Sequence, residues 1–296
     1  MAQLLVALGD YPHTRPLTEG TATVDGCSVA FADIEPIHRA FGPMVRELRY
    51  DVCELAITTL LQAREAGVPI TMLPLAMNGD GHHRSLNRRP DRASLAPADL
   101  IGGRVAVRAY TQTTGMWVRG LLREEHGIDA EQITWMTTEG PHVDSYHEPE
   151  FVQRAEASVA TLVAEDVVDA AIVGPRALTA EGLTLEPVFA DADAADNAWI
   201  ARHGTIPINH LVAVRTDLVQ SEPGAIGALY RALRDAILAT ADQRDATAHG
   251  RAVRCGWTEE LRVAIEIAGR FGVEQGLLRG PADVEALEAQ TASLEL

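Results

Sequence analysis

The sequence contains no lysine, because all 25 of its basic residues are arginine. Enzymes that form a Schiff base with a carbonyl substrate, and those that hold pyridoxal phosphate covalently, need a lysine amine. The P-loop of nucleotide-binding proteins also needs a lysine that reaches the phosphates. These classes are therefore excluded, and a clamp for an anionic ligand would have to be built from arginine.

Cysteine is scarce as well. Cys27, Cys53 and Cys255 lie far apart, are odd in number and include no C-x-x-C pair, which fits neither a disulfide framework nor a zinc site. The first residues show no basic leader, and the apolar run at residues 4–8 is the size of a strand. We therefore expect a cytoplasmic protein in a reducing compartment.

Positive charge is in deficit, with a formal net charge of -17. This surplus of carboxylates repels nucleic acid and anionic membrane surfaces, and excludes both as partners. The chain has 296 residues with 47% hydrophobic content, which is enough for two compact domains. Repeats and low-complexity tracts are absent. A homo-oligomer remains open.

Residues 104–127 read as a strand, a polar loop and a helix that ends at Gly127. In an open parallel sheet, ligands bind beyond the carboxyl ends of the strands, where the start of a helix attracts anions. Tyr110, Thr113 and Thr114 occupy this position and are candidates for substrate binding. The alternative is an ordinary turn in which the threonines only cap a helix.

Further polar side chains follow other predicted strands. Asp10 and Arg15 come after the strand at residues 4–8, and Glu54 lies where a strand at residues 50–56 runs into a helix. A solvated turn would explain the first two, and a helix N-terminal charge would explain Glu54. His210 precedes an apolar strand at residues 211–214.

Two adjacent histidines, His82 and His83, stand beside Arg84 in a loop after the strand at residues 68–76. Paired histidines suggest proton transfer or metal binding. Consecutive residues of an extended segment point to opposite faces, however, so a metal is the weaker alternative.

Strands alternate with helices in both halves, and the strand near residue 211 is expected to return to the first domain. We predict an α/β protein of two lobes with a ligand cleft between them: residues 1–100 plus 206–296 form one lobe, and the inserted residues 101–205 form the other. This organisation resembles the type II periplasmic-binding-protein fold, and residues 100–107 and 168–174 resemble its second lobe.

A narrower resemblance rests on motifs in one order along the chain: Gly9-Asp10-Tyr11, Thr14-Arg15-Pro16-Leu17, Asp51-Val52-Cys53-Glu54-Leu55, Tyr110, Thr113, Trp117-Val118-Arg119-Gly120-Leu121-Leu122, Trp135, and the segment from Pro207 to Leu211. Together they resemble the 4,5-dihydroxyphthalate decarboxylase family. The resemblance implies a cytoplasmic enzyme that removes a carboxylate from a dihydroxylated aromatic acid. Pro12, His13, Ala109 and the order His83-Arg84-Ser85 depart from the pattern, and leave the particular substrate open.

Two other functions compete with the decarboxylase. The same fold serves solute-binding proteins of ABC-type uptake systems, and it also hosts cofactor-free lyases that act on other cyclic carboxylic acids. A transport receptor needs export and a ligand clamp, whereas this chain places more titratable side chains after its strands than binding alone requires. The sequence therefore favours the enzyme.

The resemblance and the residue types predict roles. Arg15, Arg84 and Arg119 are candidates for holding substrate carboxylates, because a guanidinium grips a carboxylate with two parallel hydrogen bonds. Trp117, two residues before Arg119 on one helix, is a candidate for contacting the small anionic aromatic substrate.

The chemical step needs a proton donor at the ring carbon that loses carbon dioxide, and histidine suits this near neutral pH. One of His82, His83 or His210 is expected to deliver the proton, while Glu54 or Asp10 orients or deprotonates a ring hydroxyl. We expect no cofactor; a divalent metal ion that polarises the hydroxyls is the alternative.

Overall fold

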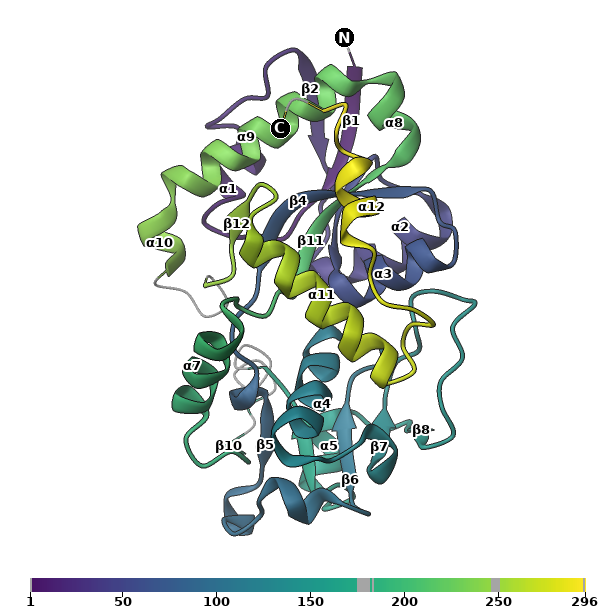
Figure 1. Cartoon of the computed structure of the whole chain (residues 1–296), viewed down its shortest axis with the longest axis vertical. Coiled ribbons are helices and arrows are strands. Elements are labelled where there is room, and N and C mark those ends of the chain that lie inside the picture. The colour runs from purple at the N-terminus through teal and green to yellow at the C-terminus, as the bar shows by residue number, and fades with distance from the viewer. Residues whose placement is uncertain (1, 175–181, 183, 246–250, 295) are drawn as a thin grey trace. The chain divides into compact units, whose positions relative to one another are not determined.

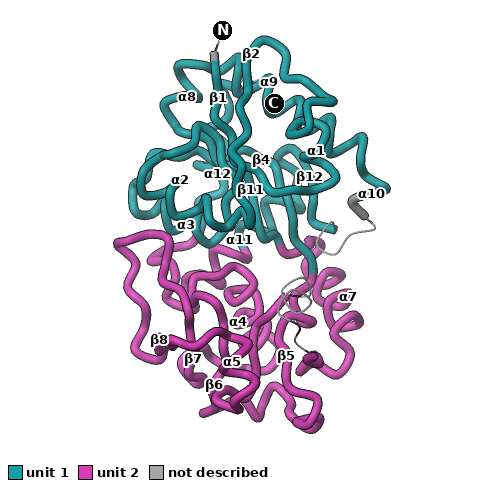
Figure 2. The backbone as a smooth tube through the Cα atoms, turned by 180° about the vertical axis from the view of Figure 1, so that it is seen from behind, with its two compact units in different colours: residues 1–80, 208–266, 282–296 teal, residues 81–207, 267–281 magenta. Residues whose placement is uncertain are grey.

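The computed structural model describes residues 2–174, 182, 184–245, 251–294 and 296 (Figure 1). The chain divides into two compact units, coloured separately in Figure 2. Unit 1 consists of residues 1–80, 208–266 and 282–296, and unit 2 of residues 81–207 and 267–281. Among the described residues, each unit contains one sheet of six strands.

The sheet of unit 1 has the strand order β12-β4-β11-β3-β1-β2. β1 is parallel to β2 and β3, while β11 is antiparallel to both β3 and β4. The carboxyl ends of β1, β3 and β4 therefore share the edge at which β11 begins. The strands are β1 (Ala2–Ala7), β2 (Cys27–Phe31), β3 (Val52–Ala56), β4 (Ile70–Asn78), β11 (His210–Arg215) and β12 (Arg254–Cys255).

Helices cover both faces of this sheet (Figure 1). α9 (Pro223–Ala239) packs Ile226, Leu229 and Leu233 against β1, β3, β4 and β11 in one apolar core. Burying each such side chain contributes about 1.5–3 kcal/mol. The other described α-helices of the unit are α1 (Arg15–Thr18), α2 (Phe41–Glu47), α3 (Ile57–Glu65), α8 (Thr216–Ser221), α10 (Ala241–Asp245) and α12 (Val284–Ala289), together with α11 (Glu259–Glu274), which continues into unit 2.

The sheet of unit 2 has the strand order β10-β5-β9-β6-β7-β8. α5 (Val159–Ala164) packs on a small core with Ala106, Ala171 and Val173. The other described helices of the unit longer than one turn are α4 (Thr113–His126) and α7 (Ala192–His203). The strands are β5 (Leu86–Arg88), β6 (Arg104–Val107), β7 (Thr134–Thr137), β8 (Val152–Arg154), β9 (Ala170–Ile172) and β10 (Glu186–Pro187).

The first unit boundary lies after residue 80 rather than after residue 100, whereas the chain returns to unit 1 at residue 208, two residues from the position expected. Residues 81–100 belong to unit 2, because β5 pairs with β9 and β10 in that sheet. Residues 267–281 also belong to unit 2, where the Phe271 ring packs on Trp117 and the Gln275 side chain bonds to Arg119. The sequence does not mark the boundary between residues 266 and 267, since it falls inside the continuous helix α11.

No helix within the described ranges is both long enough and apolar enough to cross a membrane.

Gly120 of α4 provides a test of packing in unit 2. A Cβ atom at this position would lie 2.0 Å from Cδ2 of Phe271. We expect Gly120→Ala to lower the free energy of unfolding by about 1–3 kcal/mol, because the ring must shift in a filled core. Urea denaturation measures this. Gly224→Ala is the matched control, since that helical glycine has nothing within 4 Å of an added Cβ; equal stability losses in both variants would contradict the packing argument.

Candidate active site

The Glu54 carboxylate lies at the centre of a hydrogen-bonded cluster in unit 1 and is fully buried. Its Oε2 accepts a hydrogen bond from the Gly9 N–H at 2.8 Å. Its Oε1 accepts one from the Tyr11 hydroxyl at 2.7 Å and lies 2.5 Å from Nδ1 of His210. A buried carboxylate requires such donors, since an unpaired charge in the interior is costly.

The sheet register brings Glu54 and His210 together. His210 pairs with Ala56, and Val212 pairs with Glu54. Side chains directly opposite one another, and those two residues along a strand, share a face, so Glu54 and His210 are diagonal neighbours.

The turn after β1 supplies the other two donors. Thr14 fastens this turn, because its hydroxyl donates to the Gly9 carbonyl and accepts from the Tyr11 N–H. The Tyr11 ring folds back over Gly9, where a Cβ atom would lie 2.6 Å from the ring. Glycine is therefore needed at position 9 for Tyr11 to reach Glu54.

Asn78 completes the cluster from the end of β4. Its side-chain amide nitrogen donates to the Tyr11 hydroxyl at 2.6 Å and lies 2.9 Å from Nδ1 of His210. Nδ1 carries at most one hydrogen, and the carboxylate is its stronger acceptor. The bonds therefore run from Asn78 to Tyr11 and on to Glu54, with His210 donating to the same carboxylate.

These contacts set the charge of Glu54. Burial acts to raise the pKa of the Glu54 carboxyl, but the hydrogen bond and charge of His210, together with the bonds from Tyr11 and the Gly9 N–H, outweigh it and lower the pKa. Glu54 is therefore ionised near neutral pH. A carboxylate at Nδ1 fixes the orientation of the His210 ring.

His210 can act on a substrate through its other ring nitrogen. The side chain is 19% exposed, whereas that of Glu54 is 0% exposed. Phe41 meets the imidazole edge-on, with ring centroids 5.1 Å apart. With Nδ1 engaged by Glu54, Nε2 is the nitrogen that can give or take a proton.

Asp10 and Arg15, also in unit 1, bind one another. The Arg15 guanidinium donates to both oxygens of Asp10, at 2.7 and 3.0 Å, and both side chains are more than half exposed. Asp10 therefore forms a bidentate ion pair with Arg15. The expected roles of these two residues with substrate remain predictions.

Unit 2 contains the other two candidate histidines. His82 is buried and stacks on Trp117, with centroids 6.3 Å apart. Nδ1 of His83 lies 2.6 Å from Asp196, and Nε2 lies 2.9 Å from Glu125. Burial acts to lower the pKa of His83, but the two carboxylates raise it to about 9. Since both ring nitrogens are occupied, proton donation by His83 would first have to break an ion pair.

The two arginines predicted in unit 2 also have protein partners. Arg84 donates to Asp193 at 2.7 Å. The buried Arg119 guanidinium lies 4.0 Å from the centre of the Tyr110 ring and donates to the Tyr110 carbonyl and to Gln275. Thr113 is buried and Thr114 half-buried at the start of α4. These contacts explain why Arg119 is buried. Contact of the substrate with the two arginines or the two threonines stays a prediction.

Within the described ranges, no group of three or more His, Cys, Asp or Glu side chains is arranged to hold a metal ion. The expectation of a cofactor-free reaction thus rests on residue chemistry alone.

The chain is similar to two curated proteins named 4,5-dihydroxyphthalate decarboxylase. The protein from Comamonas testosteroni is 32% identical over 245 residues, covering 78% of this chain and 73% of that protein. The chain belongs to the 4,5-dihydroxyphthalate decarboxylase family. The relative from Pseudomonas putida is 34% identical over 134 residues, covering 45% of this chain and 52% of that protein. The resemblance predicted from the sequence is therefore confirmed. As a member of this decarboxylase family, the chain is a carboxy-lyase.

The solved structures confirm the predicted fold class. A desulfurization enzyme named DSZB has a TM-score of 0.62 at 17% identity, over 99% of both chains. The alkanesulfonate-binding protein SsuA of Xanthomonas axonopodis pv. citri, bound to MOPS, has a TM-score of 0.57 at 12% identity, covering 99% of this chain and 91% of that one. A Candida albicans protein described as having the generic periplasmic binding protein fold has a TM-score of 0.59 at 12% identity, covering 99% and 95%. No family model matches the sequence.

No role was predicted from the sequence for Tyr11 or Asn78. Tyr11 stands in the Gly9-Asp10-Tyr11 motif that resembles the decarboxylase family, so a signal for it was present. Asn78 ends β4, next to the His82-His83 loop, and only the pairing of β4 with β11 places it beside His210.

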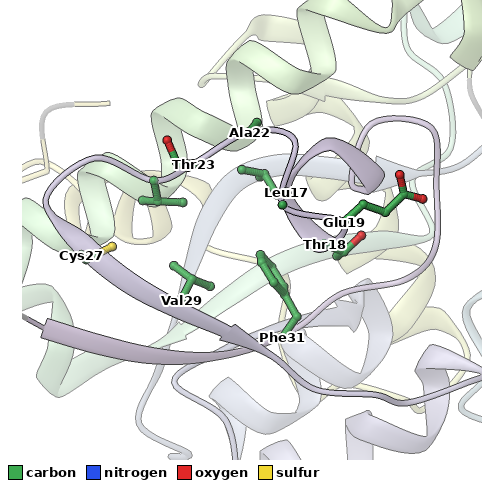
Figure 3. Close-up of a pocket in the computed structure, with 10 residues that line it drawn as sticks. Leu17, Thr18, Glu19, Ala22, Thr23, Cys27, Val29 and Phe31 are labelled. Carbon is green, nitrogen blue, oxygen red and sulfur yellow. The ribbon is translucent and has the colours of Figure 1, made fainter.

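Unit 1 also contains a cavity of about 410 Å³, bounded by α1, β2 and the loop that joins them. In Figure 3, Val29 and Phe31 point from β2 toward Leu17. Cys27 lies at one end of the cavity, and burial raises the pKa of its thiol, which keeps it neutral and a poor nucleophile. None of the residues predicted to bind or transform substrate in this decarboxylase family member lines this cavity.

Proposed function

We propose that the protein decarboxylates 4,5-dihydroxyphthalate or a closely related hydroxylated aromatic dicarboxylate, with His210 as the acid. The observation that carries the proposal is the pair formed by His210 and the buried Glu54, in a chain whose relatives are named for this reaction. His82 and His83 were equal candidates for the acid in the sequence. His210 is preferred because it combines a buried ionised partner with a partly exposed ring.

The chemistry needs one proton per turnover. The imidazolium of His210 transfers the proton on Nε2 to the ring carbon that carries the departing carboxylate, and the hydroxyl oxygen para to that carbon shares the positive charge formed in the ring. The bond between this carbon and the carboxylate then breaks, its electron pair restores the aromatic ring, and carbon dioxide leaves. Neutral His210 regains a proton from water. Glu54 holds the His210 ring at Nδ1 throughout and does not touch the substrate.

We propose that the reaction uses no cofactor and that the protein is cytoplasmic. The three cysteines are free thiols, which supports a reducing compartment. A divalent ion is the alternative source of polarisation for the hydroxyls. Full activity after exhaustive chelation would rule out the metal ion. Loss of activity on chelation, restored by added metal, would establish it. A homo-oligomer stays a prediction that light scattering would check.

The deciding experiment incubates the protein with 4,5-dihydroxyphthalate, its isomers and unsubstituted phthalate, and measures released carbon dioxide and the aromatic product. We expect release from the 4,5-isomer and none from phthalate, which lacks the para hydroxyl. Release from another hydroxylated acid only would keep the reaction and change the substrate. No turnover with any acid, combined with tight binding of an unrelated solute, would favour a solute-binding protein instead.

A further inference from the structure

We propose that Tyr11 and Asn78 are positioning residues that hold Glu54 ionised and keep the proton of His210 on Nδ1. Neither residue is expected to touch the substrate. This inference rests on the proposed role of His210 and deepens it, because it names the residues that prepare the acid.

The two neighbours of the Tyr11 hydroxyl fix the direction of its hydrogen bond. The phenol oxygen carries one hydrogen, and it lies 2.7 Å from Oε1 of Glu54 and 2.6 Å from the amide nitrogen of Asn78. Asn78 can only donate through that nitrogen, so the phenol oxygen accepts from Asn78 and its hydrogen points to Glu54. Asn78 thereby prevents the hydroxyl from turning away.

Two side chains share one carboxylate oxygen of Glu54. Tyr11 and His210 both bond to Oε1 of Glu54, while the Gly9 N–H binds Oε2. Glu54 is fully buried and Tyr11 nearly so, at 8% exposed. A buried carboxylate that loses a donor recovers little from water, so the remaining donors cannot fully replace the phenol.

Among the described residues, the titratable groups that interact with Glu54 include Tyr11, His210 and, on its own strand, Cys53. Burial and the nearby Glu54 charge raise the pKa of Cys53 well above its usual value, so that thiol stays neutral. Removing the phenol would raise the pKa of Glu54, and once Glu54 is protonated it no longer attracts the hydrogen of Nδ1. The preferred tautomer of neutral His210 would then be lost.

Tyr11→Phe tests the first part, and Tyr230→Phe is its matched control. Tyr230 is also buried in the core of unit 1, but its hydroxyl lies beside Gly256. We expect Tyr11→Phe to lower kcat by about 10-fold to 100-fold with little change in KM, as for loss of a hydrogen bond to a charged group. The acid limb of the pH–rate profile should move to higher pH, because activity falls where Glu54 takes up a proton. The control should keep the profile.

Nitrogen-15 NMR of labelled histidine provides a readout that needs no turnover. In the wild-type protein, neutral His210 should carry its proton on Nδ1, and in Tyr11→Phe a measurable fraction should carry it on Nε2. If the protein decarboxylates nothing but shows this tautomer change, the proposed function fails and the positioning role stands. An unchanged tautomer and an unchanged acid limb in Tyr11→Phe would overturn the inference.

Asn78→Leu tests the second part through a double-mutant cycle. Because Asn78 acts only by aiming the Tyr11 hydroxyl, the single change should reduce kcat less than Tyr11→Phe does. In the Tyr11→Phe background it should cause no further loss. Additive effects of the two changes would show that Asn78 acts independently, and would overturn its role in aiming Tyr11.

Discussion

Replacing His210 with glutamine should lower kcat for decarboxylation by about 10²-fold to 10⁴-fold, the range for loss of a positioned general acid. Glutamine keeps a hydrogen-bond donor for Glu54 but cannot deliver a proton to a ring carbon. KM should change little, since the arginines predicted from the sequence to hold the substrate carboxylates are unchanged. Steady-state assays of carbon dioxide release would measure both constants.

A matched control for this change is His147→Gln. His147 is exposed in the loop before β8, where its Nδ1 contacts only the nearby Ser145 carbonyl among the bonds described. This variant should keep wild-type activity. Near-normal kcat in His210→Gln would remove His210 as the acid and return attention to His82, which is buried beside Trp117.

The second large effect concerns stability at alkaline pH. The pKa of His83 is raised from 6.5 to about 9 because the hydrogen bonds and charges of Asp196 and Glu125 outweigh its burial. A group with a raised pKa stabilises the folded state fully below its unfolded pKa, and this contribution is lost as pH rises through the folded pKa. We therefore expect the free energy of unfolding to fall by about 3 kcal/mol between pH 6.5 and pH 9 from this group alone.

Urea denaturation at a series of pH values would measure this loss. His83→Gln should be less stable than the wild type at pH 6.5, because Asp196 and Glu125 lose their cation, and the difference should shrink as pH rises to about 9.5. Arg84 lies 3.6 Å from Asp196 and would offset part of the change. His147→Gln should follow the wild-type curve. A pH-independent difference between His83→Gln and wild type would show that His83 is neutral in the folded protein.

Much of the fold follows from local patterns in the sequence. The strands predicted at residues 4–8, 50–56 and 68–76 form β1, β3 and β4, and the strand predicted at residues 211–214 forms β11, each with ends within two residues of those predicted. Gly127 ends α4 in the left-handed conformation that favours glycine. The strands missed by prediction, such as β5 and β10, have only two or three residues, which is too short for a period to show.

The candidate site was predictable only in part. Glu54 was selected because it lies where a predicted strand runs into a helix. His210 was selected because histidine suits proton transfer and its segment resembles the family, and the sheet register joins the two residues. The sequence could not separate His210 from His83, because the carboxylates that bind His83 stand 42 and 113 residues away from it along the chain. Only tertiary structure shows that one histidine has both nitrogens occupied and the other has one directed to a buried carboxylate.

Because α11 runs from one unit into the other, neither unit can be excised as one continuous fragment. The helix begins in unit 1 and ends in unit 2, where Phe271 packs on Trp117 and the following Gln275 bonds to Arg119. A fragment of residues 81–207 would therefore lack the segment that covers the aromatic and guanidinium groups of α4. Exchange of unit 2 between relatives would need four junctions rather than two, one of them inside a helix. We therefore expect recombination between relatives to keep both units from the same parent, so that the two units are inherited together.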